Sequence, residues 1–404
     1  MDKKNKNPNV PNLRFREFSL PWHQIPIKDL LSFQNGINGV PEQYGKGIKY
    51  ISVGDILNND YITYDKIVGS IDISQETLKN YSVTYGDILF QRSSEIKDDI
   101  GRTNVYLDKD NTATFGGFVI RGKKIGDYNP SFFSFLLKSP SSRKSIVRLG
   151  AGAQHYNIGQ ENIKTLSFYF PNEIEQVKIA NLLSKIDERI QTQIKIINAL
   201  DSQRKCIFLK VHRAQSLKKI KIFELGRMIA ANNLSKDELS IKGNECILYG
   251  ELFTKYNLYI DNVISKTEKI DNAIISSGND ILFPTSTTVD AFSLIKPSAL
   301  IKKGVILGGD MFSIKLKDDY NPIYISCLIN FIYRKKFASK TQGSTIIHLH
   351  YSDIKNEVIE ICDYEIQCKI ANLIESITEK LKVEEELLNL LYIQKSYLLQ
   401  NMFI

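Results

Sequence analysis

One segment of this chain occurs twice, 191 residues apart. Residues 176–182 read Gln-Val-Lys-Ile-Ala-Asn-Leu and residues 367–373 read Gln-Cys-Lys-Ile-Ala-Asn-Leu. Further matched segments are 86–90 with 279–283, 116–117 with 308–309, and 127–130 with 319–322. A period of nearly half of the 404 residues is too long for a solenoid repeat, so it predicts a tandem duplication of a whole domain. We expect a pseudo-two-fold molecule with two related binding surfaces.

Composition limits the class of protein. At 43% apolar and 24% charged residues, the chain can bury ordinary cores. It lacks the run of about 18–20 apolar residues that a membrane span needs, and its polar, lysine-rich start is no secretory signal, so we expect a cytoplasmic protein without a membrane partner. The five cysteines have no Cys-x-x-Cys spacing, which predicts reduced thiols and no metal site. A net charge of +8 suits a polyanionic partner.

Two long helices are predicted, one ending each copy. No proline or glycine occurs between Pro171 and Gly226, and apolar residues recur there at alternating spacings of three and four, as in a coiled-coil seam. The predicted seam positions are Ile179, Leu183, Ile186, Ile190, Ile197 and Leu200, and in the second copy Ile370, Ile374, Ile377, Leu381, Leu388 and Leu391.

Pairing of these helices with each other is the expected arrangement. About 40 residues make a helix of roughly 60 Å, which is longer than a small domain is wide. The alternative is that each helix packs only on its own domain. The first helix leads into the second copy, so the second helix can return along it only if the pair is antiparallel. Polar seam residues predict the contacts Glu384 with Arg204 and Gln193 with Lys395.

The remaining chain has the pattern of α+β domains. Strand-like runs at 48–51, 87–90, 118–120 and 166–170 alternate with turn signals, and helices are predicted at 131–137 and 323–332. The predicted division is therefore a first domain at 1–170, a helix at 171–217, a second domain at 218–361 and a second helix at 362–404.

Polar loops separate the matched segments, and there the two copies differ. Guanidinium, amide and hydroxyl groups of this kind can bond to the edges of DNA bases. The alternative is that these are solvated loops, which change freely after a duplication. The candidate DNA-binding residues are Gln91, Arg92, Ser93, Ser94, Lys97, Arg102, Gln154, His155, Tyr156 and Asn157 in the first copy, and Thr285, Ser286, Thr287, Thr288, Gln342, Ser344, Thr345 and His348 in the second.

Three segments together resemble a known family. The opening Pro11-Asn-Leu-Arg-Phe-Arg-Glu-Phe18, followed by Trp22, is similar to the start of specificity subunits of type I restriction–modification enzymes. The segments that begin at Pro171 and at Asp363 resemble the Glu/Gln…Ile-Ala-x-Leu signatures of that family's conserved helical regions. The second segment has Cys362-Asp363 where the family has proline.

The resemblance implies a fold, a function and a set of partners. It implies two target recognition domains joined by an antiparallel coiled coil, each reading one half of a bipartite DNA site, with the helices setting the spacer. The subunit would be non-catalytic. Its partners would be double-stranded DNA and two modification (methyltransferase) subunits, which two restriction (translocase and nuclease) subunits can join. S-adenosylmethionine, ATP and Mg²⁺ would bind those partners, and this chain would hold no cofactor.

Two other functions make different demands on the sequence. An adenine methyltransferase needs an Asn/Asp-Pro-Pro-Tyr/Phe loop, and Asn129-Pro-Ser-Phe132 and Asn321-Pro-Ile-Tyr324 both lack the second proline. There is no Gly-x-x-x-x-Gly-Lys-Ser/Thr phosphate loop, and His348 and His350 have no third metal ligand nearby in sequence. A coiled-coil adaptor that binds proteins, without sequence-specific DNA binding, remains open.

Overall fold

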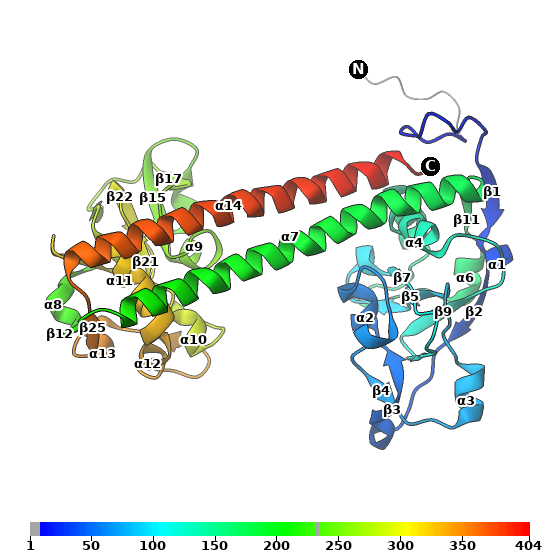
Figure 1. The fold of residues 1–404 in the computed structure, drawn as a ribbon, viewed down its shortest axis with the longest axis horizontal. Helices are drawn as coiled ribbons and strands as arrows, with labels where there is room; N and C mark the ends of the chain where they lie inside the picture. The colour runs from blue at the N-terminus through cyan, green and yellow to red at the C-terminus, as the bar shows by residue number, and fades with distance from the viewer. Residues whose placement is uncertain (1–8, 232–233) are drawn as a thin grey trace. The chain divides into compact units, whose positions relative to one another are not determined.

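The structure is a computed structural model that describes residues 9–231 and 234–404. The chain forms two compact units. Unit 1 combines the chain up to Lys195 with Glu386–Ile404, and unit 2 is Ile196–Glu385. Two long helices, α7 (Glu173–Arg213) and α14 (Tyr364–Asn401), each contribute to both units and are unbroken along their length (Figure 1).

Unit 1 is built on a four-stranded antiparallel sheet with the strand order β2-β9-β5-β7. Its strands are β2 (Leu31–Asn35), β9 (Val119–Lys124), β5 (Ile88–Gln91) and β7 (Thr103–Val105). A three-stranded sheet holds β4 (Ser70–Ile71), β3 (Tyr44–Ile51) and β8 (Thr114–Phe115), and β1 (His23–Pro26) pairs with β11 (Ser167–Phe170). The helices are α1 (Ile27–Leu30), α2 (Val53–Asn58), α3 (Gln75–Asn80), α4 (Pro130–Lys138), α5 (Pro140–Val147) and α6 (Gln160–Lys164).

Unit 2 repeats this order of elements with larger sheets. One sheet has the order β13 (Gly226–Ala230), β23 (Met311–Leu316), β19 (Asp280–Pro284), β21 (Ser298–Leu300) and β16 (Tyr259–Ile260). The other has the order β14 (Leu239–Ser240), β17 (Ser265–Thr267), β15 (Asn244–Leu248), β22 (Lys303–Gly308) and β18 (Ile275–Ser277), and β12 (Lys218–Lys221) pairs with β25 (Val358–Ile361). The helices are α8 (Ile222–Leu225), α9 (Tyr249–Thr254), α10 (Ala291–Leu294), α11 (Pro322–Leu328), α12 (Arg334–Ala338) and α13 (Tyr351–Ile354).

The repeated sequence segments are the scaffold of each unit. The Asp-Ile-Leu-Phe runs form the central strands β5 and β19, whose Ile, Leu and Phe side chains are fully buried. Each such side chain contributes about 1.5–3 kcal/mol through its burial. Asn129 and Asn321 cap α4 and α11 by accepting the N–H groups of Phe132 and Tyr324. The predicted strands and the helix at 131–137 are confirmed.

The helix predicted at 323–332 is only partly right. The α-helix α11 ends at Leu328, and Ile329–Tyr333 form a π-helical turn that leads into α12. In unit 1, Pro140 starts a separate helix, because proline lacks the N–H group that would continue the previous one. Unit 2 has no proline between Pro322 and Ala338, so its chain stays helical through this turn.

Within each unit, segments of α7 and α14 pack together and run antiparallel. In unit 1, Ile179, Leu183 and Ile190 share a core with Leu391 and Leu398. In unit 2, Phe208 near the end of α7 shares a core with Ile370 and Ile374 near the start of α14. The predicted pairing of the two helices is therefore confirmed in each unit by itself.

All twelve predicted seam residues are at least partly covered. Eight are buried, namely Ile179, Leu183, Ile186, Ile190, Ile370, Ile374, Leu381 and Leu391. Ile197, Leu200, Ile377 and Leu388 are half-buried.

In the seam, Lys395 and Arg204 contact residues other than the predicted ones. Lys395 Nζ lies 2.5 Å from Asp187 Oδ1, and Arg204 donates to Thr378 Oγ1 at 3.0 Å. These two contacts are equivalent, because Thr378 is the copy of Asp187 and Lys395 is the copy of Arg204, each 191 residues on. The packing of apolar seam residues sets this register, and it carries the polar side chains to partners other than those expected.

Candidate nucleic-acid interface

The structure joins the two candidate segments of the first copy. Strand β6 (Ser93–Ser94) pairs with β10 (Tyr156–Asn157), although more than 60 residues separate them in sequence. The Ser93 hydroxyl donates to Asn157 Oδ1 at 2.6 Å. Residues 91–97, Arg102 and residues 151–157 therefore form one surface cluster at the end of β5, which we call reading cluster 1.

The side chains of reading cluster 1 differ in how far they face solvent. Exposed members are Lys97, Arg102, Gln154, His155 and Asn157, while Arg92, Ser93, Ser94 and Tyr156 are half-buried. Gln91 is the exception, because its side chain is buried and donates to the carbonyl of Ser93 at 2.8 Å. This placement makes Gln91 a support beneath the loop, where it does not face a ligand.

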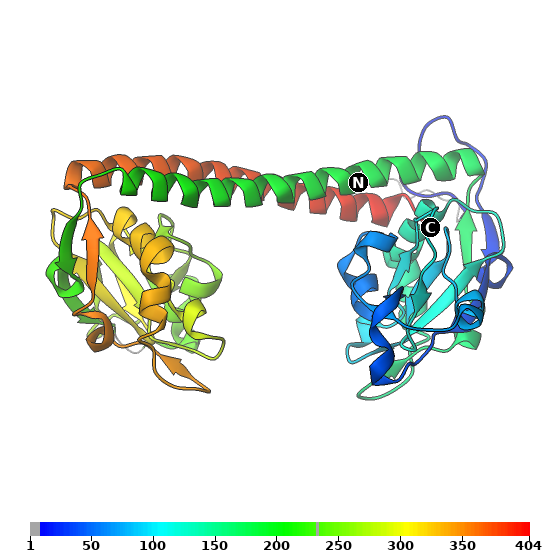
Figure 2. The ribbon, with the colours of Figure 1, turned by 60° about the horizontal axis from the view of Figure 1, so that its bottom comes forward.

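The second copy has an equivalent cluster at the end of β19. Strand β20 (Ser286–Thr287) pairs with β24 (Ile347–His348), and this reading cluster 2 joins the predicted segments 285–288 and 342–348. Exposed members are Thr288, Gln342, Ser344 and Thr345, and half-buried members are Thr285, Ser286, Thr287 and His348. The hairpin of residues 342–348, in orange, extends from the body of unit 2 (Figure 2).

Both hairpins turn at a glycine in the same position of the repeat. Gly152 has φ +135° and Gly343 has φ +100°, and a Cβ atom on either would meet a carbonyl oxygen at 2.0 or 2.1 Å. Only glycine fits such a turn. The residues that follow the glycines differ completely, being Ala-Gln-His in unit 1 and Ser-Thr-Ile in unit 2. The duplication has thus kept the turn and changed the side chains that it presents.

Several apolar side chains next to the clusters were not predicted. Phe118 is 67% exposed and its carbonyl accepts the N–H of Arg92, and Ile96 is 60% exposed within reading cluster 1. Val289 beside reading cluster 2 and Ile346 within it are also exposed. Apolar groups can contact the thymine methyl in the major groove, but single exposed apolar residues are also common on protein surfaces. They could not be predicted from the sequence, because an apolar residue in a loop carries no hydrogen-bonding group that points to a base.

A second exposed surface lies on α14. Leu387, Leu390, Ile393 and Tyr397 are all exposed, and they recur every three or four residues on a face of unit 1 other than the seam. Leu390 is 60% exposed. Such a stripe of exposed apolar side chains is typical of a protein interaction site, and its spacing suits a helical partner.

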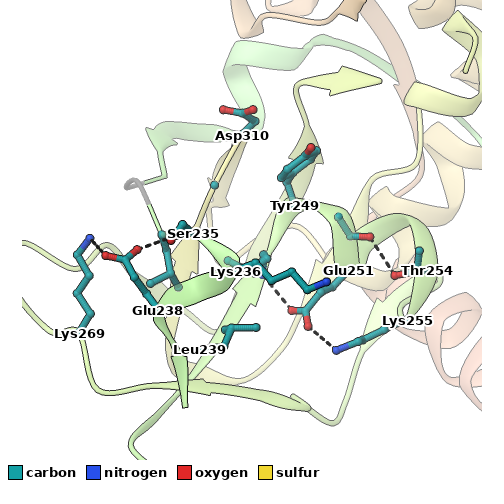
Figure 3. Close-up of a pocket in the computed structure, with 14 residues that line it drawn as sticks. Ser235, Lys236, Glu238, Leu239, Tyr249, Glu251, Thr254, Lys255, Lys269 and Asp310 are labelled. Carbon is teal, nitrogen blue, oxygen red and sulfur yellow. Dashed lines mark hydrogen bonds and ion pairs between the residues drawn. The ribbon is translucent and has the colours of Figure 1, made fainter. Parts of the chain in front are cut away.

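A cavity of about 890 Å³ in unit 2 lies between α9 and residues 234–239 (Figure 3). Four of the six charged side chains that line it are paired with one another. Lys269 pairs with Glu238, which lowers the pKa of that carboxyl, and Lys255 lies 2.7 Å from Glu251. The residues that line the cavity include neither histidine nor cysteine. It is therefore a poor candidate for an active site.

Other site types find no support in the described part of the chain. Within residues 9–231 and 234–404, no group of three or more His, Cys, Asp or Glu side chains could hold a metal ion. His348 and His350 stack in parallel with ring centroids 6.2 Å apart. Among the same residues, no helix combines the length and the apolar character needed to span a membrane.

Comparison with known proteins identifies what the chain is similar to. The profile of the "Type I restriction modification DNA specificity domain" matches residues 21–202 and again residues 217–392. The chain is 27% identical over 230 residues to the protein described as the type I restriction enzyme MjaX specificity subunit of Methanocaldococcus jannaschii, which covers 54% of this chain and 53% of the relative. It is 25% identical over 196 residues to the type I restriction enzyme HindI specificity subunit of Haemophilus influenzae, covering 46% and 40%. The matches thus span about half or less of each relative's length.

Solved structures share the fold. The crystal structure of a type I restriction-modification system S subunit from M. genitalium has a TM-score of 0.57 at 17% identity, covering 98% of this chain and 99% of that one. A chain from a study of complex assembly and conformational transition in the type I R-M system has a TM-score of 0.58 at 10% identity, covering 95% and 98%. The predicted α+β tandem architecture is confirmed by these matches and by the two profile matches.

Proposed function

Since the chain belongs to the family of type I restriction modification DNA specificity domains, we propose that it is the sequence-recognition subunit of a type I restriction–modification complex. In this proposal the subunit is non-catalytic and binds a bipartite, asymmetric DNA site. The domain of unit 1 reads one half-site and the domain of unit 2 reads the other. Its DNA substrate implies a cytoplasmic location.

The observation that carries this proposal is the pair of reading clusters. Each lies at the end of an equivalent buried strand, β5 or β19, and each is closed by an equivalent two-strand ladder and glycine turn. Their exposed side chains differ at almost every position. One frame that presents two different sets of hydrogen-bonding groups is suited to reading two different base sequences.

The chemistry of the clusters assigns different tasks to different side chains. Lys97 and Arg102 are exposed cations that can hold phosphates and set the position of the domain on the duplex. Gln154 and Asn157 can bond to adenine, while the hydroxyl groups of Ser344 and Thr345 can donate to or accept from any base edge. Reading cluster 2 has fewer charges, so its half-site would be read more by hydroxyl and amide contacts.

The partners follow from the family and from the exposed face of α14. We expect two modification subunits to dock on the helices, and the apolar stripe of Leu387, Leu390, Ile393 and Tyr397 supports a helical partner there. S-adenosylmethionine would bind the modification subunits, which flip the target adenine out of the duplex. Two restriction subunits, with ATP and Mg²⁺, can join this assembly.

Exchange of one reading loop tests the proposal. Residues 91–97 are replaced by the equivalent residues 284–290 of the second copy, and the complex with its modification subunits methylates a randomised plasmid library. We expect one half of the methylated sequence to change and the other half to stay the same, because each loop belongs to one domain. Sequencing of methylated adenines gives the readout.

A polar replacement of the exposed helix α3, residues 75–80, is the matched control and should leave both halves unchanged. A change in both half-sites after the loop exchange would rule out independent readers. Methylation or DNA retention without any sequence preference in the unaltered complex would favour the coiled-coil adaptor instead.

A further inference from the structure

Two arginines occupy the same position in the two copies. Arg143 lies in α5 and Arg334 begins α12, and they are separated by the same 191 residues as the turn glycines Gly152 and Gly343. Both helices lie between the scaffold helix (α4 or α11) and the hairpin of a reading cluster. The two arginines, each followed by a lysine (Lys144 and Lys335), are therefore a matched pair within a largely divergent part of the duplication.

Arg143 binds the backbone of the loop that follows β6. Its guanidinium donates to the carbonyl of Gly101 at 2.7 Å, to that of Ile100 at 2.8 Å and to that of Asp98 at 3.0 Å. This loop carries Lys97 and Arg102, two of the exposed cations of reading cluster 1. The flat guanidinium group, with its fixed fan of N–H donors, is suited to hold several carbonyl groups at once.

Arg334 does the same for the segment that follows β20. Its Nε donates to the carbonyl of Phe292 at 2.9 Å, and its guanidinium lies 4.1 Å above the centre of the Phe292 ring. That segment, α10, is capped at its start by Asp290, whose carboxylate accepts the N–H of Ser293 at 2.8 Å. The contact between α12 and α10 thus repeats the contact between α5 and the loop at Lys97–Asp99.

Main-chain contacts explain how the loop sequences could change between the two copies while the arginine stayed the same. Arg143 donates to three carbonyl oxygens and Arg334 to one. Every residue has such an acceptor, so the loop sequence can change without loss of these bonds, and only the stacking of Arg334 on Phe292 depends on a side chain. The loops themselves have little other regular support, since β6 and β20 are only two residues long. Fixing a loop before it meets its ligand lowers the entropy lost on binding and holds its side chains in one arrangement.

We propose that Arg143 and Arg334 are positioning residues that fix the backbone of the two reading loops, so that each one sets how accurately its own half-site is read. This inference rests on the proposed function. It assigns the two arginines to the loop backbone and not to the DNA phosphates.

The test uses the complete complex of this chain with its modification subunits and the variants R143Q and R334Q. Binding is measured on DNA that carries single base changes in either half-site. For R143Q we expect discrimination at the half-site of unit 1 to fall about tenfold, which corresponds to the loss of one good base contact. Discrimination at the other half-site should not change, and R334Q should give the mirror result.

Two readouts separate positioning from phosphate binding or from general damage. Loss of a phosphate contact would weaken binding to all sequences and reduce the salt slope by about one unit, whereas we expect an unchanged salt slope. Amide hydrogen exchange at residues 97–101 should become faster in R143Q, while exchange in β5 stays slow. R143K keeps the charge but cannot span three carbonyls, so it should not restore discrimination.

Neighbouring exposed cations provide the controls. R148Q and K335Q remove the same charge within five residues of each arginine without removing a loop contact, and both should match the unaltered complex. If the unaltered complex is specific and both R143Q and R334Q distinguish correct from changed half-sites as well as it does, the inference is overturned. Absence of sequence preference in the unaltered complex would instead overturn the proposed function and the inference with it.

Discussion

In each unit, one buried glutamine connects the domain to its long helix through two hydrogen bonds. Gln176 Oε1 accepts the N–H of Asn129 at 2.9 Å while its Nε2 donates to the carbonyl of Pro171 at 3.0 Å. Gln367 makes the same two bonds, to Asn321 at 3.0 Å and Cys362 at 2.8 Å. Both side chains are buried. An amide group is needed there because it is donor and acceptor at once, which explains why glutamine opens the repeated segment.

The variant Gln176→Glu tests this role. Its carboxylate would lose the donated bond and face the buried carbonyl of Pro171, so we expect unit 1 to lose about 2 kcal/mol or more. Trp22 is the only tryptophan of the chain and is buried in unit 1, so its fluorescence during denaturant unfolding reports this unit. Asn181→Asp makes the same chemical change at an exposed site of α7 and should have little effect. Equal denaturant midpoints for Gln176→Glu and Asn181→Asp would contradict this role of Gln176.

Arg14 and Glu175 form a buried ion pair in unit 1. The guanidinium of Arg14 donates two bonds of 2.7 Å to the carboxylate of Glu175, which is fully buried. The indole N–H of Trp22 also points to this carboxylate, at 3.4 Å. A buried carboxylate needs such partners, because removal of one partner leaves an uncompensated charge. The opening segment and the start of α7 are thus tied together in unit 1.

At the scale of elements, the end of α7 is anchored by a buried histidine. The His212 ring stacks on Phe208 with centroids 5.8 Å apart, and its Nδ1 lies 2.9 Å from the hydroxyl of Tyr324 in α11. Burial lowers the pKa of His212, with Glu360 opposing and Arg213 adding to this shift. The neutral ring is therefore the form that fits this site.

Unit 2 should lose stability as the pH falls below about 6.5, the ordinary pKa of histidine. Below this pH the unfolded chain takes up a proton on His212 more readily than the folded chain does. The free energy of unfolding therefore falls by up to about 1.4 kcal/mol per pH unit until the pH reaches the lower pKa of the folded state. Above pH 6.5 the stabilisation from neutral His212 is fully present. An NMR titration of the His212 ring should give a midpoint below 6.5. His212→Gln should flatten the dependence, whereas His23→Gln, at an exposed site, should not.

At the scale of the whole molecule, the duplication repeats contacts as well as elements. The contact of Lys395 with Asp187 in unit 1 occupies the same repeat positions as the contact of Arg204 with Thr378 in unit 2. One contact is an ion pair and the other is a hydrogen bond to a hydroxyl group. The repeat positions have thus been kept while the chemistry at them has changed, as in the reading clusters.

Insertion of seven residues in both helices, after Lys195 and after Glu385, tests the role of the helices in the proposed function. Seven residues preserve the heptad seam and lengthen each helix by about 10 Å. We expect the spacer between the methylated half-sites to grow by about three base pairs, at about 3.4 Å per base pair. Four residues inserted near Gln203 in α7 lengthen that helix by about 6 Å and should also alter the spacer. An unchanged spacer after the matched insertion would argue against helix length as the determinant.

The sequence by itself determined the features that depend on local pattern or on internal repetition. The 191-residue offset predicted two equivalent domains, and the spacing of Ile179, Leu183 and Ile186 predicted a buried seam. Both predictions are confirmed. They could be made because a helical period and a repeated segment can be recognised in the amino-acid sequence alone. The positions of the divergent loops could be predicted in the same way, by comparing one copy with the other. Whether their residues bind DNA stays a prediction.

Only the tertiary structure decided which distant residues meet. Packing of apolar side chains set the register of α7 and α14, and it brought Lys395 to Asp187. The ladder between β6 and β10 joined two loops more than 60 residues apart, and it left Gln91 beneath them. Arg143 gave no local signal, because its partners are main-chain carbonyls that any sequence provides. Such contacts arise from the folded path of the chain, so they become visible only when that path is known.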